Sequence, residues 1–233
     1  MVSFVVFDIE TIANENSAHY FLTKEYAAPG NYKDPAKIEA AIAEKRAKDI
    51  DQAALNWWTG AVVCIQASAG DEKFAGVDLD EKKLLLSFGE WLSKHYDKVL
   101  VGKSSKTFDV PFLVGRYMAH DLGVPTNLRT VDRFRVTDID QIFGHSITSG
   151  QVSTLSNYAF GLGIKGKSAS GNHVADMVNQ YLLGDKTKLT ELENYCRQDV
   201  AITEEVLRRF LKNFESDNSS TTKECTNDRT IPF

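Results

Sequence analysis

The N-terminal run Val2–Thr11 limits the folds open to this chain, because two carboxylates interrupt an otherwise apolar segment. A short run rich in β-branched and aromatic residues predicts a β-strand. Since side chains alternate between the faces of a strand, Asp8 and Glu10 project from the same face. Two like charges beside apolar neighbours repel each other and lose hydration, so a divalent metal is an economical compensation. The pair alone is equally consistent with a strand end at which both carboxylates reach water.

Length and charge leave the class of protein open. A chain of 233 residues with 42% hydrophobic residues suits one large α/β domain or two small ones. The formal net charge of -5 argues against a non-specific DNA coat, but not against an enzyme with an acidic metal site. The three cysteines, Cys64, Cys196 and Cys225, lack metal-ligand spacing, and their odd number suits a reducing compartment. Without a signal peptide or a transmembrane run, we expect a cytoplasmic protein with no membrane partner.

Strand and helix patterns alternate along the chain. Ala61–Ser68 predicts a strand that pairs with Lys73–Val77 as a hairpin, and Lys98–Gly102 and Leu128–Val136 contain two shorter strands. Helices are predicted over Ala36 to about Ala54, from Asp80 onward, from Asp109 to about His120, over Asp138–Phe143, Ser153–Phe160 and Asn172–Leu182, and from Asp185 or Thr187 to about Phe214. This order indicates an α/β fold with a mixed five-stranded sheet in which the first strand is central.

Residues 33–58 form a predicted helical insert after the first strand. Its helix has isoleucines near one face, so we expect it to be amphipathic, with its basic residues solvated. Trp57 and Trp58 at its end favour packing in the core or docking against a helix, with stacking against single-stranded bases as the alternative. Beyond the domain 1–214, polar and charged composition predicts a disordered tail over 215–233.

The last predicted helix places a carboxylate on its apolar face. The inward positions, at three- and four-residue steps, are Leu189, Leu192, Cys196, Asp199, Thr203, Val206 and Phe210. A lone carboxylate at Asp199 is costly there, and Tyr195 lies one turn earlier on the same side. The two are consistent with a structural hydrogen bond, but together with Asp8 and Glu10 a shared metal is the better account. A fourth acid, Asp109, follows a strand at a helix start, where capping is the alternative role.

Three segments resemble the motifs of a known enzyme family. Phe-Asp-Ile-Glu-Thr at 7–11, Phe-Asp-Val-Pro at 108–111 and Tyr-Cys-Arg-Gln-Asp at 195–199 are similar to the motifs of the DEDD 3′–5′ exonucleases. The tyrosine four residues before the last aspartate matches the tyrosine subtype, DEDDy. The chain up to about Phe210 further resembles predicted 3′–5′ exonucleases of bacteria and phages that are related to the proofreading domain of family-B DNA polymerases. The resemblance implies an RNase H-like fold.

The resemblance also implies a mechanism, the two-metal hydrolysis of phosphodiester bonds with Mg²⁺ or Mn²⁺. Asp8 would bridge the two ions, Glu10 and Asp199 would hold the ion on the nucleophile side, and Asp109 would serve the ion on the leaving-group side. Tyr195 would orient the attacking water. The implied product is a nucleoside 5′-monophosphate released from a 3′ end, with single-stranded DNA favoured as the substrate and RNA as the alternative.

Substrate contacts are expected from Thr11, Ser104, Phe108 and Lys167. The family commonly has Asn-Gly four and three residues before the phenylalanine of the second motif, where this chain has Ser104 and Ser105. The replacement bears on how the terminal nucleotide is held, and it leaves Asp109 in place.

Other functions are compatible with single features of the sequence. Gly161–Ser168 matches the Walker A pattern, but the preceding Ser153–Phe160 predicts a helix where a P-loop NTPase needs a strand. A binding module that does not cut nucleic acid would have no need of a buried Asp199. The C-terminal Ile231–Phe233 resembles the tip of bacterial single-stranded-DNA-binding proteins. The prediction of a replication or repair partner rests on this tripeptide alone. We therefore expect a freestanding exonuclease in a bacterial or phage-infected cell.

Overall fold

The computed structural model describes residues 3–129, 136–143, 154–166 and 174–220. Its strands form one five-stranded sheet in the order β3-β2-β1-β4-β5. They are β1 (Phe4–Ala13), β2 (Gly60–Ala69), β3 (Glu72–Val77), β4 (Val99–Gly102) and β5 (Val136–Asp138). The β1–β2 and β2–β3 pairs are antiparallel, whereas the β1–β4 and β4–β5 pairs are parallel. The predicted mixed sheet with a central first strand is therefore confirmed.

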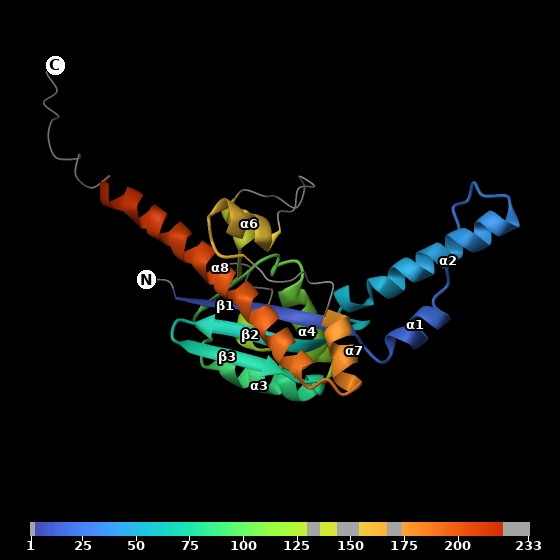
Figure 1. Ribbon diagram of the computed structural model, residues 1–233, viewed down its shortest axis with the longest axis horizontal. Helices are drawn as coiled ribbons and strands as arrows, with labels where there is room; N and C mark the ends of the chain where they lie inside the picture. The colour runs from blue at the N-terminus through green and yellow to red at the C-terminus, as the bar shows by residue number, and fades with distance from the viewer. Residues whose placement is uncertain (1–2, 130–135, 144–153, 167–173, 221–233) are drawn as a thin grey trace, which may run out of the picture.

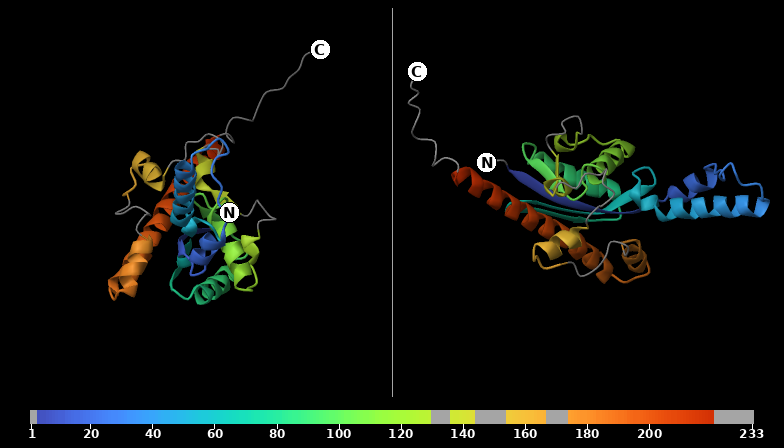
Figure 2. Two further views of the ribbon diagram at one scale, coloured as in Figure 1. Left: turned by 90° about the vertical axis from the view of Figure 1, so that its right-hand side faces the viewer. Right: turned by 90° about the horizontal axis from the view of Figure 1, so that it is seen from above.

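Helices cover both faces of this sheet, with α3 and α4 on one side and α8 lying diagonally across the other (Figures 1 and 2). The α-helices are α1 (Ser17–Thr23), α2 (Pro35–Asp51), α3 (Glu81–Ser93), α4 (Asp109–Ala119), α5 (Ile139–Ile142), α6 (Leu155–Gly161), α7 (Val174–Leu182) and α8 (Thr187–Ser220). Two 3-10 turns are η1 (Ala53–Leu55) and η2 (Thr126–Leu128). Among the helices described, none has both the length and the apolar character needed to cross a membrane.

Alternate side chains of β1 belong to two separate cores. Val5, Phe7 and Ile9 are buried in a cluster that includes the apolar face of α3 and α4. Val6 points the other way and packs in a cluster with Val206 of α8. Because residues two apart in a strand share a face, β1 directs Asp8 and Glu10 toward α8 as well.

A β-bulge in the β1–β2 pair lies beside Glu10. Glu10 pairs with Cys64 and Thr11 pairs with Val62, so Val63 is the extra residue on β2. Val63 and Cys64 are consecutive, yet both are buried in the cluster beneath α7 and α8. Bulges redirect side chains and are common next to active sites. Here the bulge directs Cys64 toward α8 at the position opposite Glu10.

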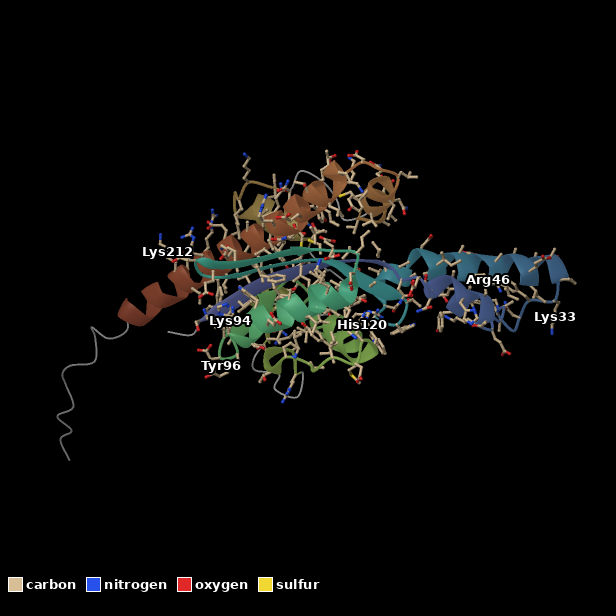
Figure 3. The ribbon with its side chains drawn as sticks, turned by 90° about the horizontal axis from the view of Figure 1, so that it is seen from below. Lys33, Arg46, Lys94, Tyr96, His120 and Lys212 are labelled. Carbon is tan, nitrogen blue, oxygen red and sulfur yellow. The ribbon has the colours of Figure 1, made fainter. Side chains whose placement is uncertain are left out.

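The predicted insert 33–58 contains α2, which together with α1 forms an arm that extends from the end of the sheet (Figures 1 and 2). The predicted α2 is present, with Asp34 as its cap, but none of its residues is buried and Ile50 is 51% exposed. Ile38 and Ile42 are half-buried and the basic residues of the helix are exposed, as expected, whereas α1 was not predicted. In Figure 3, Lys33 marks the outer part of the arm and Arg46 lies closer to the sheet.

The last helix continues to Ser220, beyond the predicted end near Phe214. No proline or glycine occurs between these positions to end it. Residues 221–233, with Cys225 and the C-terminal Ile-Pro-Phe, lie outside the described residues, so the tail and the tripeptide stay predictions.

A buried ion pair joins α3, α4, β2 and the end of the arm. Glu81, which is 7% exposed, accepts hydrogen bonds from Arg116 (Nη2 to Oε2, 2.6 Å) and from the Val62 N–H (2.7 Å). His120 Nε2 lies 2.6 Å from Glu81 Oε2, on the side of α4 nearest the arm (Figure 3). Arg116 Nη1 also donates to the carbonyl of Trp57 at 3.0 Å. Charge-assisted bonds of this kind are stronger than neutral ones, so the network fixes the arm to the sheet.

We predict that Glu81→Ala lowers the free energy of unfolding by about 3–5 kcal/mol, because it leaves Arg116 buried without its carboxylate. Burial opposes the ionisation of Glu81, but its hydrogen bonds with Arg116, Val62 and His120 hold its pKa below the ordinary value. Since the folded pKa is lowered, this contribution is complete above the unfolded pKa of about 4.3 and is lost as the pH falls through the folded pKa.

Urea unfolding at pH 7 and along a series of acidic pH values measures both effects. The exposed Glu90, on the same helix, is the matched control, and Glu90→Ala should change stability by less than about 0.5 kcal/mol. Equal losses in the two variants would contradict a stabilising role for the network.

Candidate active site

The candidate site lies where β1 runs past the end of β4. The parallel pairing of β1 with β4 involves only Phe4–Val6 of β1, so Asp8 and Glu10 lie beyond the paired part. This is the carboxyl end of the parallel strands, the edge at which open α/β sheets bind their ligands.

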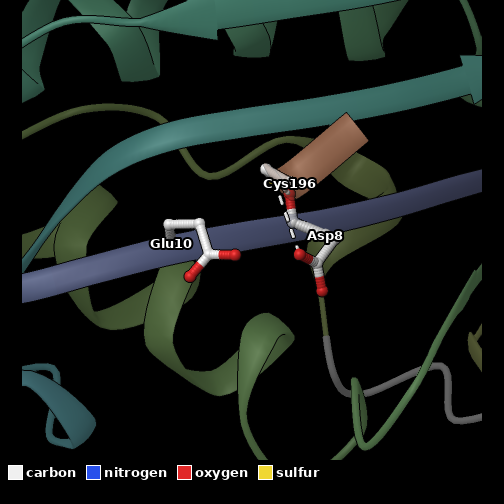
Figure 4. A group of neighbouring side chains, drawn as sticks. All are labelled: Asp8, Glu10 and Cys196. Atoms are coloured by element: carbon white, nitrogen blue, oxygen red, sulfur yellow. Dashed lines mark hydrogen bonds between the residues drawn. The ribbon is translucent and has the colours of Figure 1, made fainter. Parts of the chain in front are cut away.

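Asp8 and Glu10 are joined there by a thiol from α8. The ligand atoms of Asp8, Glu10 and Cys196 all lie within 4.8 Å of one another. Cys196 Sγ donates to both the main-chain oxygen and the Oδ2 of Asp8, each at 3.5 Å (Figure 4). The two carboxylates are half-buried and the thiol is fully buried. The carboxylates are thus the reachable part of the group.

Asp109 approaches the same strand from the start of α4. Its side chain is buried, at 3% exposure. Burial raises the pKa of Asp109 well above its usual range, and the nearby charge of Asp8 raises the pKa further. The N–H groups of Asp109 and Ile9 bind this carboxylate and oppose the shift. The raised pKa marks a region of negative potential, to which a divalent cation is suited.

Tyr195 lies on the buried face of α8, at 6% exposure. Burial raises the pKa of its phenol, and the charges of Glu10 and Asp8 raise it further, which places the ring beside β1. Asp199 is also buried, at 7% exposure, and follows Tyr195 by one helical turn. The structure therefore brings Asp8, Glu10, Asp109 and Tyr195 together, with Asp199 on the same face of α8.

Cys196 is the site residue to which sequence reasoning gave no role. It was expected on the inward stripe of the last helix, and that placement is confirmed. Burial raises the pKa of its thiol, which also hydrogen-bonds with Cys64. Its position between Tyr195 and Asp199, on one face of the same helix, was the available signal.

Two aspartates hold the loop that precedes Asp109. Asp138 Oδ1 accepts from the Ser104 N–H at 2.9 Å, and Asp140 Oδ2 accepts from the Ser104 hydroxyl at 2.9 Å. Tyr158 donates to the other oxygen of Asp140 at 2.7 Å. Ser104 has a φ of 59°, a left-handed conformation that asparagine adopts more readily than serine does.

The remaining predicted contact residues have structural partners. Thr11 Oγ1 donates to the carbonyl of Ala54 at 2.7 Å, which ties β1 to the end of the arm. Phe108 packs against Phe112, with 5.5 Å between the ring centroids. Lys167 lies outside the described residues.

The glycine-rich loop after Gly161 follows a helix, α6, as expected. A P-loop requires a strand at that place, so the Walker A resemblance is incidental.

Comparison with known proteins fixes the family. A model of the RNase H superfamily matches residues 49–211. The chain belongs to the RNase H superfamily. The matched part contains Asp109, Tyr195 and Asp199 and begins after Asp8 and Glu10. Membership confirms the expected RNase H-like fold and supports a nuclease; RNase H-like nucleases generally use divalent metal ions, in agreement with the acidic group on β1.

The fold is also similar to that of the family B DNA polymerase from the hyperthermophilic archaeon Pyrobaculum calidifontis. The TM-score is 0.57 at 19% sequence identity, over 91% of this chain and 25% of the polymerase chain. This RNase H superfamily member thus spans about a quarter of that polymerase, and the likeness concerns the fold alone. No curated protein has a significantly similar sequence.

We predict that Asp109→Asn stabilises the metal-free protein at pH 7. Because the folded pKa of Asp109 is raised, the native state binds its proton more tightly than the unfolded state does. Stability is therefore highest below the unfolded pKa of about 3.9 and is lost as the pH rises from there toward the folded pKa. The substitution removes this loss, and each unit of raised pKa corresponds to about 1.4 kcal/mol.

Urea unfolding in EDTA measures the gain, which should exceed about 1 kcal/mol. Asp97→Asn, at an exposed position, is the control and should have almost no effect. A loss of stability in Asp109→Asn would show that the native state does not oppose the ionisation of this carboxylate.

Proposed function

We propose that this protein is a metal-dependent 3′–5′ exonuclease of the DEDDy type, which releases nucleoside 5′-monophosphates. The observation that carries the proposal is the meeting of Asp8, Glu10, Asp109 and Tyr195 at the end of the parallel strands. The RNase H superfamily membership supports a nuclease. The order and spacing of the three motifs support the exonuclease subtype, and with it a domain over 1–214.

The acidic residues fit a pair of hard divalent cations. Asp8, Glu10, Asp109 and Asp199 would hold two Mg²⁺ or Mn²⁺ ions, since carboxylate oxygens are the ligands these ions prefer. When bound, the ions would lower the pKa of water and neutralise the charge of the phosphodiester. The raised pKa of Asp109 supports this assignment, because repulsion from Asp8 is relieved by a cation.

Tyr195 is a hydrogen-bond donor in this proposal. Burial and the charges of Glu10 and Asp8 raise the pKa of its phenol, so it keeps its proton at neutral pH. A protonated phenol cannot accept a proton from water, but it can donate a hydrogen bond to a water or a phosphate oxygen. Tyr195 therefore orients the nucleophile. Cys196 holds the Asp8 carboxylate through its Sγ–H.

The proposed substrate is the 3′ end of single-stranded DNA, in keeping with the resemblance to polymerase proofreading domains. RNA is the second candidate, since the same residues would hydrolyse either sugar. A bacterial or phage-infected cytoplasm would be the setting in which this activity serves replication or repair.

We predict that a 5′-labelled single strand is shortened stepwise from its 3′ end in Mg²⁺ or Mn²⁺, and not in EDTA. Asp8→Ala should lower the rate by more than about 10³-fold, which corresponds to about 4 kcal/mol of transition-state stabilisation. Gel electrophoresis of matched DNA and RNA oligonucleotides measures direction and substrate together. Asp97→Ala is the control for an exposed carboxylate. Equal rates in wild type and Asp8→Ala, or products that shorten from the 5′ end, would contradict the proposal.

We predict that Tyr195→Phe lowers the rate by about 10²-fold, within the range of a lost proton-positioning group. It should leave metal binding unchanged, since the phenol is not a metal ligand. Rates measured over a pH series separate the two roles: an orienting donor gives a uniform loss, whereas a base would change the pH profile. Tyr96→Phe, at an exposed position on another surface, is the control.

A further inference from the structure

Two adjacent tryptophans are exposed at the root of the arm. Trp57 is 41% exposed and Trp58 is 50% exposed. Their rings meet edge to face, with centroids 5.7 Å apart and planes at 88°. Packing in the core or against a helix was expected for both; Trp57 lies against α4, but neither ring is in the core. Indole rings are among the most costly side chains to leave in water, so a fixed exposed pair requires an explanation.

Trp57 is fixed against α4, the helix that begins at Asp109. A Cβ placed on Gly115 would lie 2.4 Å from Trp57 Cδ2, so the indole lies directly on the glycine backbone. Arg116 donates to the Trp57 carbonyl at 3.0 Å and is itself held by Glu81. The ring of Trp57 thereby becomes a rigid support for its neighbour.

Trp58 is fixed against β1, the strand that carries Asp8 and Glu10. Asn14 Nδ2 donates to the Trp58 carbonyl at 3.3 Å, and the Asn14 N–H donates to the Thr59 carbonyl at 2.8 Å. Asn14 follows Glu10 by four residues, which is about 13 Å along an extended chain. The main chain that carries the exposed indole is therefore tied to the segment of chain that continues from the carboxylates.

We propose that Trp57 and Trp58 form a stacking platform for the bases of the substrate strand upstream of its 3′ end. The inference rests on the proposed exonuclease function and names a contact of the same site. Every base has a π-face, so an indole binds single strands without regard to sequence. A sequence-independent contact is what an enzyme that removes successive nucleotides needs.

Stacking, not charge, is the source of this affinity. The arm helix α2 carries four basic residues and four acidic residues, so it offers the phosphates no net attraction. Loss of the platform should therefore weaken binding by the same factor at low and high salt, because no counterions are released by stacking. The expected loss for Trp58→Ala is about 5- to 150-fold in Kd, the range for one stacked base.

The test measures the binding of 5′-labelled oligothymidylate by fluorescence anisotropy, in full-length protein carrying Asp8→Ala to prevent cleavage. Trp58→Ala should weaken binding, and Trp58→Phe should restore most of the affinity because it keeps an aromatic face. Phe160→Ala, on α6, removes a side chain that is 90% exposed and serves as the matched control, with no expected change.

Oligonucleotides with a single abasic residue at successive distances from the 3′ end locate the contact. A protein with Trp58 intact should lose affinity at one or two of these positions, and Trp58→Ala should lose nothing further there. Unfolding curves in urea confirm that each variant is folded.

Three outcomes would overturn the platform. They are unchanged affinity in Trp58→Ala, a loss that differs between low and high salt, and a change in oligomeric state by light scattering that identifies the pair as a contact between copies. Failure of the exonuclease proposal is distinguishable from these: single strands would then bind through Trp58 while unsubstituted protein leaves them uncut in Mg²⁺ and Mn²⁺.

Discussion

The unequal pairing of the central strand determines the rest of this structure. β1 is paired with β2 from Val6 to Ala13, whereas β4 pairs only with its first residues, Phe4 to Val6. Beyond Val6, the side of β1 that faces β4 has no strand beside it. The main-chain N–H and C=O groups on that side need other hydrogen-bond partners. Asp109 lies beside this edge, since the backbone of Ile9 and the charge of Asp8 both act on the pKa of its carboxylate. The same edge lets the side chains of Asp8 and Glu10 reach the end of the sheet, so the site is a consequence of where β4 stops.

Such a site acts against stability in the absence of its ligand. Asp109 is buried beside Asp8, and the raised pKa of Asp109 records the cost of charging it. The two cores on either side of β1 and the buried Glu81–Arg116 pair lie outside this group and hold the strand in place. Repulsion within the site is thus tolerated because apolar packing fixes the backbone around it. The same arrangement favours a cation over any rearrangement of the carboxylates.

The sequence predicted the sheet well because its strands are bounded by turn residues and because alternation fixes which face each residue occupies. It placed Asp8 and Glu10 together for that reason, and the 3.6-residue period of a helix placed Tyr195, Cys196 and Asp199 on one face. It predicted the helix α2 but not how little of it is buried, since an apolar spacing does not say whether any surface is available to pack against. The left-handed φ of Ser104 could not be predicted from the sequence either. The hydrogen bonds that hold Ser104 come from Asp138 and Asp140, which lie in a distant segment of the chain. Helical spacing predicts that Cys196 shares a face with Asp199, but only the fold shows that its thiol contacts Asp8.

In the described part of the chain, hydrogen bonds tie the root of the arm to β1 and α4, and this bears on which part of it can serve the proposed site. Along its length the arm is held by contacts within itself, such as the Lys24–Asp49 ion pair and the bond from Lys45 to the Ala27 carbonyl. At its root, by contrast, Thr11 of β1 and Asn14, which follows β1, donate to the carbonyls of Ala54 and Trp58. A group that must act in register with a metal site has to be fixed within a fraction of an ångström of it, which exposed ion pairs do not achieve. Any positioning of a substrate by the arm therefore falls to its root, where the two tryptophans lie.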